Sequence, residues 1–491
     1  MPVLTVHQGF QKTERIAEAG TPVSRILNEN GILTPQPCGG RGVCGKCAAM
    51  MEGQLSEPTA AERKAGARLI CQAVLLGDAS ITIPQFQPMD QIETGGMTVA
   101  PDHPLGTGVG AAVDIGTTTL ALRLFDLQTG HCLGVSSMAN PQIAVAADVI
   151  GRIGAAMDGR QEQLRSAIVS AIETLIVQAA VQAEVEPGAV QTLAVTGNTT
   201  MLYLLTGQNP ESLSHAPFEA DCLFDETVLL GSRKAYLPPC LHAFVGADIT
   251  CAVLASGMMQ KDEVALLCDV GTNGEIALWK DGILYVASTA AGPAFEGAGI
   301  TCGCGSIPGA IDRVAVNEDA LEVSTIRNEA AVGLCGSGLV DAVACMLELE
   351  WVDETGAMDD DEVTLKDSVV LTQADIRAVQ LAKAAIAAGI ECLLHTAGIK
   401  HEQVQHVYLA GGFGSHLNLT NAARIGLLPE SLIGKTKVIG NAALDGTVMT
   451  LLRGENLQAL RRIASCAKHV DLGGNPVFNE QYVEMMFFPE E

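Results

Sequence analysis

Four cysteines near the N-terminus constrain the fold more than any other feature of the sequence. They are Cys38, Cys44, Cys47 and Cys71, with five residues in the first gap and two in the second. The text around the first three, Cys-Gly-Gly-Arg-Gly-Val-Cys-Gly-Lys-Cys, is rich in glycine. Glycine lets a backbone approach a bound group closely and adopt positive φ angles. The sequence therefore predicts a loop that wraps around a metal centre held by these four thiolates.

The spacing resembles that of [2Fe-2S] ferredoxins. The plant-type pattern has four residues in the first gap, and the five found here resemble the adrenodoxin-type variant. Backbone N–H groups of such a loop would point at the sulfur atoms and tune the reduction potential. A zinc site made by the same thiolates is the alternative, although zinc ribbons normally pair two Cys-x2-Cys knuckles.

Residues 1–85 are expected to form a small β-grasp domain of the ferredoxin type. The apolar residues Val3, Leu4 and Val6 predict an opening strand, and Ile81-Thr82-Ile83 predicts a short closing strand. The following residues, 86–109, contain proline and glycine with little periodicity, which is typical of a linker.

Composition narrows the class of protein. A chain of 491 residues is too long for one compact core, so two or three domains are expected. The net charge of −27 disfavours a nucleic-acid partner. The sequence shows no signal peptide and no uninterrupted apolar stretch of membrane-spanning length, so we expect a cytoplasmic protein without membrane contact. The 15 cysteines are then thiols or ligands, not disulfides.

The remainder of the chain contains a weak internal repeat. An apolar strand runs into Asp-Ile-Gly-Thr-Thr over residues 111–118, and the same shape recurs at 266–273 with Asp-Val-Gly-Thr-Asn. Each is followed by another strand-like run. Two hairpins of one design predict two similar α/β halves that face one cleft, a first lobe over 110–263 and a second over 264–491.

Two helices are predicted from apolar periodicity. One carries its apolar stripe on Leu164, Ile168, Ile172 and Ile176. The other extends from Ile376 to Leu393, with Thr372 as its expected N-cap.

The repeated hairpins are candidate phosphate binders, and no Walker A motif is present. Tight turns of this kind present N–H groups and hydroxyls to phosphate oxygens, and an Asp at the strand end can hold Mg²⁺ through water. The predicted metal-organising residues are Asp114 and Asp269. The predicted phosphate contacts are Gly116, Thr117, Thr118, Gly271, Thr272 and Asn273.

Two further segments complete the pattern. Ala-Gly-Gly-Phe-Gly at 410–414 follows an apolar strand, and Gly411, Gly412 and Gly414 would let an adenosine lie against bare backbone. The small-residue segment 441–447 looks like a helix start with an acidic group, Asp445, near the cofactor.

These four pieces, in this order, resemble the ATPase superfamily of actin, sugar kinases and heat-shock chaperones. The resemblance implies a two-lobed, actin-like (ribonuclease H-like) α/β core that binds ATP with Mg²⁺. Glu275 is a candidate for positioning the attacking water, or an exposed strand residue. Asp148 is a second candidate, or a solvated helix acid. Turns that bind no ligand are the alternative reading of the hairpins.

A ferredoxin domain joined to this core resembles the reductive activators of corrinoid-dependent enzymes. Further motifs carry this resemblance: Asn140-Pro141-Gln142, Val-Thr-Gly-Asn-Thr-Thr at 195–200, Ala-Gly-Pro-Ala-Phe-Glu-Gly at 291–297 and Cys-Gly-Ser-Gly at 335–338. In that family the cluster donates one electron to a Co(II) corrinoid, and ATP binding and hydrolysis make the transfer possible. Some members have an additional linker domain, whereas only linker length separates the two parts here.

The resemblance implies several partners. They are a corrinoid protein or corrinoid-dependent methyltransferase, an external low-potential electron donor and, as one option, a second copy in a homodimer. Two other functions stay open: an ATP-gated donor to another low-potential acceptor, and a nucleotide-dependent redox sensor or assembly factor.

Overall fold

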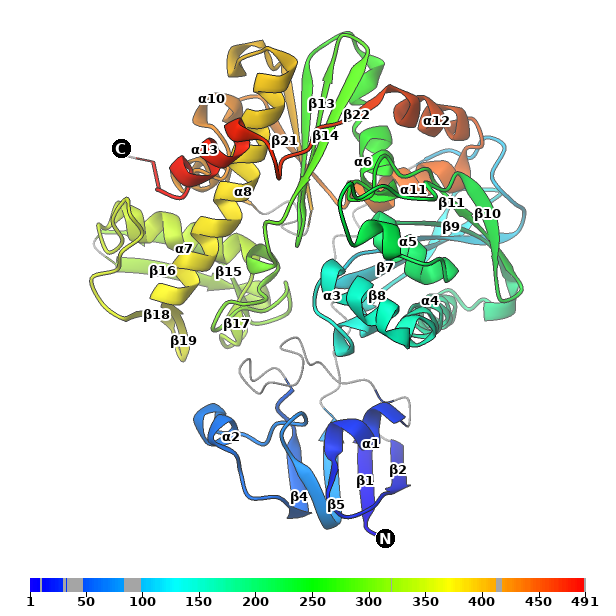
Figure 1. The fold of residues 1–491 in the computed structure, drawn as a ribbon, viewed down its shortest axis with the longest axis vertical. Coiled ribbons are helices and arrows are strands. Elements are labelled where there is room, and N and C mark those ends of the chain that lie inside the picture. The colour runs from blue at the N-terminus through cyan, green and yellow to red at the C-terminus, as the bar shows by residue number, and fades with distance from the viewer. Residues whose placement is uncertain are drawn as a thin grey trace.

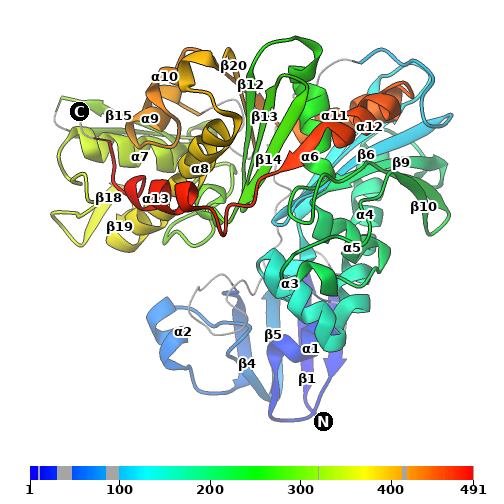
Figure 2. The same ribbon diagram turned by 45° about the horizontal axis from the view of Figure 1, so that its top comes forward.

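The structure is a computed structural model that describes residues 1–8, 11–29, 32, 47–83, 99–318, 320–411 and 417–489. A small N-terminal domain and two larger α/β lobes make up the chain (Figure 1). Turning the molecule by 45° shows the small domain below the first lobe, with the second lobe beside it (Figure 2).

The N-terminal domain is built on a five-stranded mixed sheet. Its elements are β1 (Val3–Gln8), β2 (Gln11–Ile16), β3 (Thr21–Pro22), α1 (Val23–Glu29), β4 (Met50–Leu55), α2 (Ala60–Ala65) and β5 (Val74–Ile83). Strand β5 is parallel to β1 and antiparallel to β3 and β4. The closing strand is longer than the predicted Ile81–Ile83, because Leu75, Ala79 and Ile81 all face the core of this domain.

The first lobe contains a six-stranded sheet in the order β10-β11-β9-β6-β7-β8. Its strands are β6 (Val109–Ile115), β7 (Thr119–Asp126), β8 (Cys132–Ala139), β9 (Val190–Gly197), β10 (Glu226–Leu230) and β11 (Arg233–Leu237). Its helices are α3 (Val149–Ala155), α4 (Gln161–Gln182), α5 (Thr199–Thr206) and α6 (Ala247–Ser256). The first Asp-x-Gly-Thr segment forms the predicted hairpin, with β6 antiparallel to β7.

The second lobe repeats this plan with the sheet order β21-β20-β12-β13-β14-β22. Its main strands are β12 (Ala265–Val270), β13 (Gly274–Lys280), β14 (Ile283–Thr289), β20 (His406–Gly411), β21 (Thr436–Gly440) and β22 (Ala467–His469). Two small sheets are added by β15 (Ala310–Asn317), β16 (Ala320–Thr325), β17 (Gly333–Leu334), β18 (Glu362–Lys366) and β19 (Val369–Thr372). The second hairpin, β12 with β13, is also formed as predicted.

The helices of the C-terminal half do not all stay with the second sheet. They are α7 (Gly336–Glu348), α8 (Gln373–Ala397), α9 (Leu419–Arg424), α10 (Glu430–Ile433), α11 (Ala442–Leu452), α12 (Asn456–Cys466) and α13 (Pro476–Glu484). Helix α11 packs on β6 and β9 of the first lobe and against α6. The two lobes are therefore joined by a pair of helices in direct contact.

The end of the predicted 86–109 linker is packed against α11. Val99 is buried in a cluster with Leu444 and Val448. The N–H groups of Asp102 and Leu105 donate to carbonyl oxygens at the end of α11. The described part of this segment, from Val99 onward, is thus packed on the first lobe and α11.

The two predicted amphipathic helices are present as α4 and α8. Thr372 caps α8 as expected, and Asp375 completes a capping box by accepting from the Thr372 N–H. Within the described residues, the segments Val149–Gln182 and Gln373–Ala397 are long and apolar enough to cross a membrane by length and composition. Helix α8 has this composition because it is largely buried in the second lobe.

Candidate functional site

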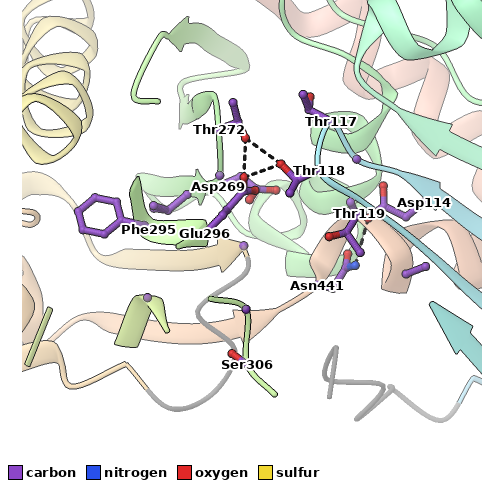
Figure 3. Close-up of a pocket in the computed structure, with 18 of the residues that line it drawn as sticks. Asp114, Thr117, Thr118, Thr119, Asp269, Thr272, Phe295, Glu296, Ser306 and Asn441 are labelled. Atoms are coloured by element: carbon purple, nitrogen blue, oxygen red, sulfur yellow. Dashed lines mark hydrogen bonds between the residues drawn. The ribbon is translucent and has the colours of Figure 1, made fainter. Parts of the chain in front are cut away.

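A cavity of about 500 Å³ lies where the two hairpins face each other. Figure 3 shows Thr117 and Thr118 of the first lobe opposite Asp269 and Thr272 of the second. Ten of the predicted site residues line the cavity: Asp114, Gly116, Thr117, Thr118, Asp269, Gly271, Thr272, Asn273, Glu275 and Gly411. Residues far apart in the sequence are thus brought into one cleft.

The backbone carbonyl oxygens at the turn of the first hairpin accept hydrogen bonds from residues of the first lobe. Asn140 donates from its side chain to the Gly116 oxygen at 2.8 Å and from its backbone to the Thr118 oxygen at 2.7 Å. Arg152 donates to the Thr117 oxygen at 2.6 Å. Carbonyl oxygens repel phosphate, so engaging them behind the loop favours an anion in the cleft.

Arg152 also places a positive charge beneath this loop. Its side chain is fully buried and also donates to the oxygens of Gln142 and Ala146. Burial lowers the pKa of Arg152 to about 10, which leaves the guanidinium charged at neutral pH. The charge therefore attracts a phosphate group on the other side of the loop.

Two asparagines orient polar groups of the cleft. Both belong to motifs described in the sequence analysis, but the sequence alone assigned them no role. Asn198, the N-cap of α5, donates to the Thr117 hydroxyl at 3.1 Å. Asn441, the N-cap of α11, donates to the Asp114 carboxylate at 3.1 Å. The available signal in the sequence was the position of each asparagine before a helix-like segment, as expected of an N-cap.

Four carboxylates crowd one end of the cleft. Asp269 and Glu275 lie directly opposite each other across the β12–β13 hairpin, and like charges in such a pair are unfavourable. Burial raises the pKa of Asp114 to about 6, with the Asn441 hydrogen bond opposing it. Burial and then repulsion from Asp248 and Asp114 raise the pKa of Asp269 to about 8.

Glu275 is buried, and its pKa is raised well above the usual range. Desolvation is the largest cause, followed by repulsion from Asp248 and Asp269. A carboxyl group in this environment favours its protonated form.

Asp248 is a cleft residue that sequence reasoning missed. It lies in the first turn of α6 and lines the cavity. Burial and the nearby Asp114 raise the pKa of Asp248 to about 7. The pattern Gly246-Ala247-Asp248 at the start of an apolar helix, shortly before the second hairpin, was the available signal.

Two acidic candidates have other contacts. Asp445 is not among the described residues that line the cavity, and its carboxylate forms an ion pair with Arg123 of β7 at 2.5 Å. Its place on α11 turns it toward the first sheet. Asp148 caps α3 by accepting from the Gly151 N–H at 2.7 Å. Gly412 and Gly414 lie outside the described residues.

The carboxylates suit a hard cation that is shared with phosphate. Within the described ranges, no three His, Cys, Asp or Glu side chains form a ready-made metal cage. Mg²⁺ is usually bound by one or two carboxylates together with water and substrate phosphates. The crowding of Asp114, Asp248 and Asp269 shows that this end of the cleft would gain from a positive charge.

Two of the four predicted cluster ligands lie together in the N-terminal domain. The Sγ atoms of Cys47 and Cys71 are 3.3 Å apart, and neither residue is in a disulfide. Glu62 accepts from the Leu69 N–H at 3.0 Å and from Arg68 at 2.8 Å, which fixes the chain just before Cys71. Two adjacent thiols at the edge of a packed core fit a shared iron centre. Cys38 and Cys44 lie outside the described residues.

Comparison with family models covers most of the chain. Residues 6–76 match a 2Fe-2S iron-sulfur cluster binding domain. Residues 109–261 match the RACo middle region, and residues 263–491 match the C-terminal domain of RACo, described as the ASKHA domain.

Two characterised proteins are similar to about three quarters of the chain. The chain is 34% identical over 419 residues to "Corrinoid activation enzyme RamQ" of Eubacterium limosum, covering 77% of this chain and 70% of that protein. It is 26% identical over 417 residues to "[Co(II) methylated amine-specific corrinoid protein] reductase" of Methanosarcina barkeri, covering 76% of each.

A solved structure extends the similarity to the whole chain. The structure titled "Reductive activator for corrinoid,iron-sulfur protein" matches with a TM-score of 0.74 and 28% identity. The match covers 100% of this chain and 98% of that one.

Proposed function

Because the chain belongs to the RACo family of reductive activators, we propose that it reduces a Co(II) corrinoid protein to Co(I) at the expense of ATP. The observation that carries this proposal is the joining of two sites in one chain. One is the pair of facing Asp-x-Gly-Thr hairpins, and the other is the adjacent Cys47–Cys71 pair on a separate domain.

The cysteines are assigned to the electron-carrying group. Cys38, Cys44, Cys47 and Cys71 would hold a [2Fe-2S] cluster, in line with the matched cluster-binding domain. When bound, such a cluster supplies electrons one at a time. Buried Cys47 and Leu69 place the Cys47–Cys71 side of the site against the core of the domain.

The cleft is assigned to Mg·ATP. The hairpin residues 116–118 and 271–273 would take the phosphates, and Gly411 would lie against the nucleoside. Asp114 and Asp269 end the two strands beside the phosphate loops and would hold the metal through water. The negative charge of these aspartates repels bare polyphosphate, so this arrangement favours nucleotide that arrives with its cation.

Asp248 lines the cavity at the start of α6 and would be a candidate to accept a proton from the attacking water. Its pKa of about 7 lies near the working pH, as general-base catalysis requires. The pKa of Glu275 is raised further above its usual range, which favours a neutral carboxyl that orients water by hydrogen bonding.

ATP is needed because the reduction of Co(II) to Co(I) is thermodynamically unfavourable. A one-electron step costs roughly 2.3 kcal/mol for every 0.1 V uphill. Nucleotide can help only by favouring a protein state in which the acceptor is easier to reduce or the product is trapped. Two lobes joined by α6 and α11 can close on nucleotide and thereby change the fit of a bound partner.

ATP hydrolysis stimulated by a Co(II) corrinoid protein tests this proposal. Asp248→Asn should lower the stimulated rate by about 10²- to 10⁴-fold while leaving the Kd for Mg·ATP little changed. Asp269→Asn should weaken both metal-dependent binding and turnover. A wild-type rate that no corrinoid protein increases, or an Asp248→Asn variant that turns over normally, contradicts these assignments.

A further inference from the structure

A glutamate of the second lobe bridges the two phosphate hairpins. The hydroxyl groups of Thr118 and Thr272 both donate to the same carboxylate oxygen of Glu296, at 2.7 and 2.5 Å. The two hydroxyl oxygens are 3.1 Å apart. Figure 3 shows these three side chains meeting in the middle of the cleft. A single anionic oxygen thus accepts hydrogen bonds from both lobes at once.

These hydroxyls are the donors that the hairpins would offer to a phosphate. Each hydroxyl has one proton to donate, and both hydroxyl oxygens lie within hydrogen-bond distance of the same Glu296 oxygen. The other carboxylate oxygen leans over the bare Gly271, 3.4 Å from where a Cβ would stand. Glu296 therefore occupies, with the same charge sign, the place that a phosphoryl group would take between the hairpins.

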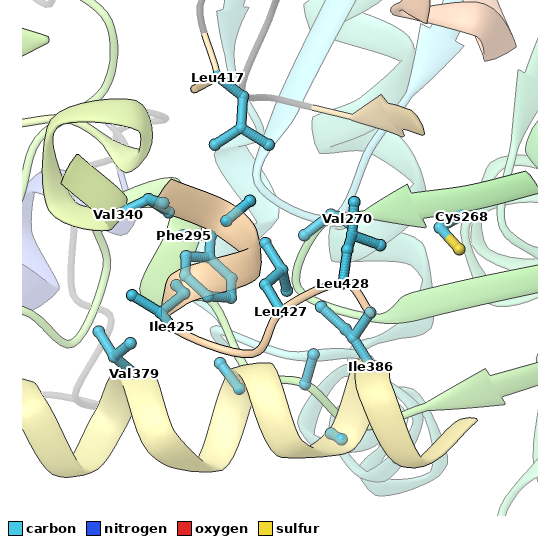
Figure 4. Close-up of a cluster of buried hydrophobic side chains, with 14 of the residues drawn as sticks. Cys268, Val270, Phe295, Val340, Val379, Ile386, Leu417, Ile425, Leu427 and Leu428 are labelled. Carbon is cyan, nitrogen blue, oxygen red and sulfur yellow. The ribbon is translucent and has the colours of Figure 1, made fainter. Parts of the chain in front are cut away.

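The backbone that carries Glu296 is held firmly. Phe295 is buried in the core of the second lobe against α8, α9 and the turn that follows α9 (Figure 4). The segment Ala294–Glu296 is a short helical turn, flanked by Gly292 and Gly297 at φ values of 79° and 76°. The Gly292 N–H also donates to the Thr272 oxygen at 2.9 Å, which ties this turn to the second hairpin. Displacement of Glu296 would therefore involve its side chain and not the turn that carries it.

The position along the cleft identifies which phosphate is replaced. Glu296 contacts Thr118 and Thr272 and lies over Gly271, two residues after Asp269 on the same hairpin, so it lies at the carboxylate end of the cavity. Gly411 and Ser337 line the cavity as well, and Gly411 belongs to the segment assigned to the nucleoside. The terminal phosphate of ATP is the group that would reach the metal-facing carboxylates.

We infer that Glu296 occupies the position of the terminal phosphate in the nucleotide-free protein and is displaced only by a nucleotide that carries one. This inference rests on the proposed binding of Mg·ATP in the cleft. It makes Glu296 a specificity residue: ATP replaces the carboxylate at Thr118 and Thr272, whereas ADP leaves the bridge in place. Release of the bridge by ATP also frees the two lobes to change their relative position.

Calorimetric titration with Mg·ATP and Mg·ADP tests this role on the full-length wild-type protein and two variants. Glu296→Gln keeps the shape but removes the charge, and Glu296→Ala removes the bridge altogether. We expect Mg·ATP to bind about tenfold more tightly to Glu296→Ala than to wild type, with Glu296→Gln in between, because the competing charge-assisted hydrogen bonds are lost. The affinity for Mg·ADP should change less than threefold.

The control is Glu402→Gln, which removes one exposed carboxylate far from the cleft. It should bind both nucleotides as wild type does. If wild type binds Mg·ATP but the Glu296 variants bind it equally or more weakly, or if Mg·ADP gains as much as Mg·ATP, the inference is wrong and the proposed function stands. If neither wild type nor variants bind Mg·ATP, both fail. Binding by the variants alone supports the inference.

Discussion

Asp269 and Glu275 face each other across one hairpin; Asp248 is close enough to raise the pKa of both, and Asp114 raises the pKa of Asp269. Such a cluster costs stability whenever all its members are ionised. The folded protein tolerates it because the large hydrophobic cores of the two lobes fix the fold. The excess negative charge is the property that a Mg·nucleotide ligand would relieve.

This cluster predicts how stability depends on pH. The pKa of Asp269 rises from 3.8 to about 8 on folding, so the folded state binds its proton more tightly than the unfolded state does. The contribution to stability is therefore complete below pH 3.8 and is lost as the pH rises to about 8. Thermal unfolding without metal should show a falling melting temperature across this window, and Mg²⁺ should restore part of it at the upper end.

Asp269→Asn is the matched variant for that measurement. It should raise the metal-free melting temperature at pH 8 by a few degrees, since about 1 kcal/mol corresponds to ~2–4 °C in a domain of this size. It should have little effect near pH 4. An equal effect of the substitution at both pH values would contradict the account.

At the scale of single residues, the sequence identifies functional residues that belong to a local motif. Asp114 and Asp269 precede Gly-Thr turns, so their place in the cleft could be predicted. Asp248 could not be assigned in the same way, because the fold alone brings the start of α6 beside the hairpins. Asp445 was assigned to the cofactor from its motif, but Arg123 on β7 provides a partner that no local pattern reveals.

At the scale of elements, α6 and α11 form the tightest contact between the lobes. A Cβ on Gly446 of α11 would lie 1.9 Å from the Cys251 oxygen of α6, so the helices touch backbone to backbone. Thr447 and Thr450 satisfy their buried hydroxyls with carbonyl oxygens one turn earlier on α11. In the proposed function, closing of the cleft would act through this pair of helices.

Gly446→Ala tests that connection. The added methyl group must push the helices apart, which should cost about 1–3 kcal/mol of unfolding free energy and lower the rate of ATP hydrolysis. Gly154→Ala in α3 is the control, since a Cβ there meets nothing within 4 Å. The control should be neutral or slightly stabilising. Denaturant unfolding of both variants measures the difference, and equal stability would contradict the proposed close contact.

Element prediction succeeded where the signal was local. The capping box at Thr372 and the apolar stripe of α8 are complete within one segment, and both hairpins are encoded by adjacent strands. The burial of Val99 could not be predicted, since it depends on α11 at the other end of the sequence. The same holds for α11 itself, which leaves the second sheet to cover the first.

At the scale of the whole molecule, the two-lobed plan could be predicted from the internal repeat. The separate N-terminal domain could be predicted from the spacing of its cysteines. In the proposed function, ATP hydrolysis in the two lobes is coupled to electron transfer from the cysteine-bearing domain. This coupling is the central claim. The ferredoxin domain and the ATPase lobes are distinct bodies in Figure 1. Coupling therefore requires the partner protein to contact both parts in the course of a turnover.

The most direct test is to follow Co(I) optically after mixing the reduced, full-length protein with a Co(II) corrinoid protein under anaerobic conditions. Samples contain Mg·ATP, a non-hydrolysable analogue or no nucleotide, with Cys71→Ser as the control that should bind nucleotide but transfer no electron. The account predicts that Co(I) accumulates with Mg·ATP and wild-type protein and remains near background in the other samples. Equal Co(I) yield without nucleotide, or undiminished yield from Cys71→Ser, would contradict it.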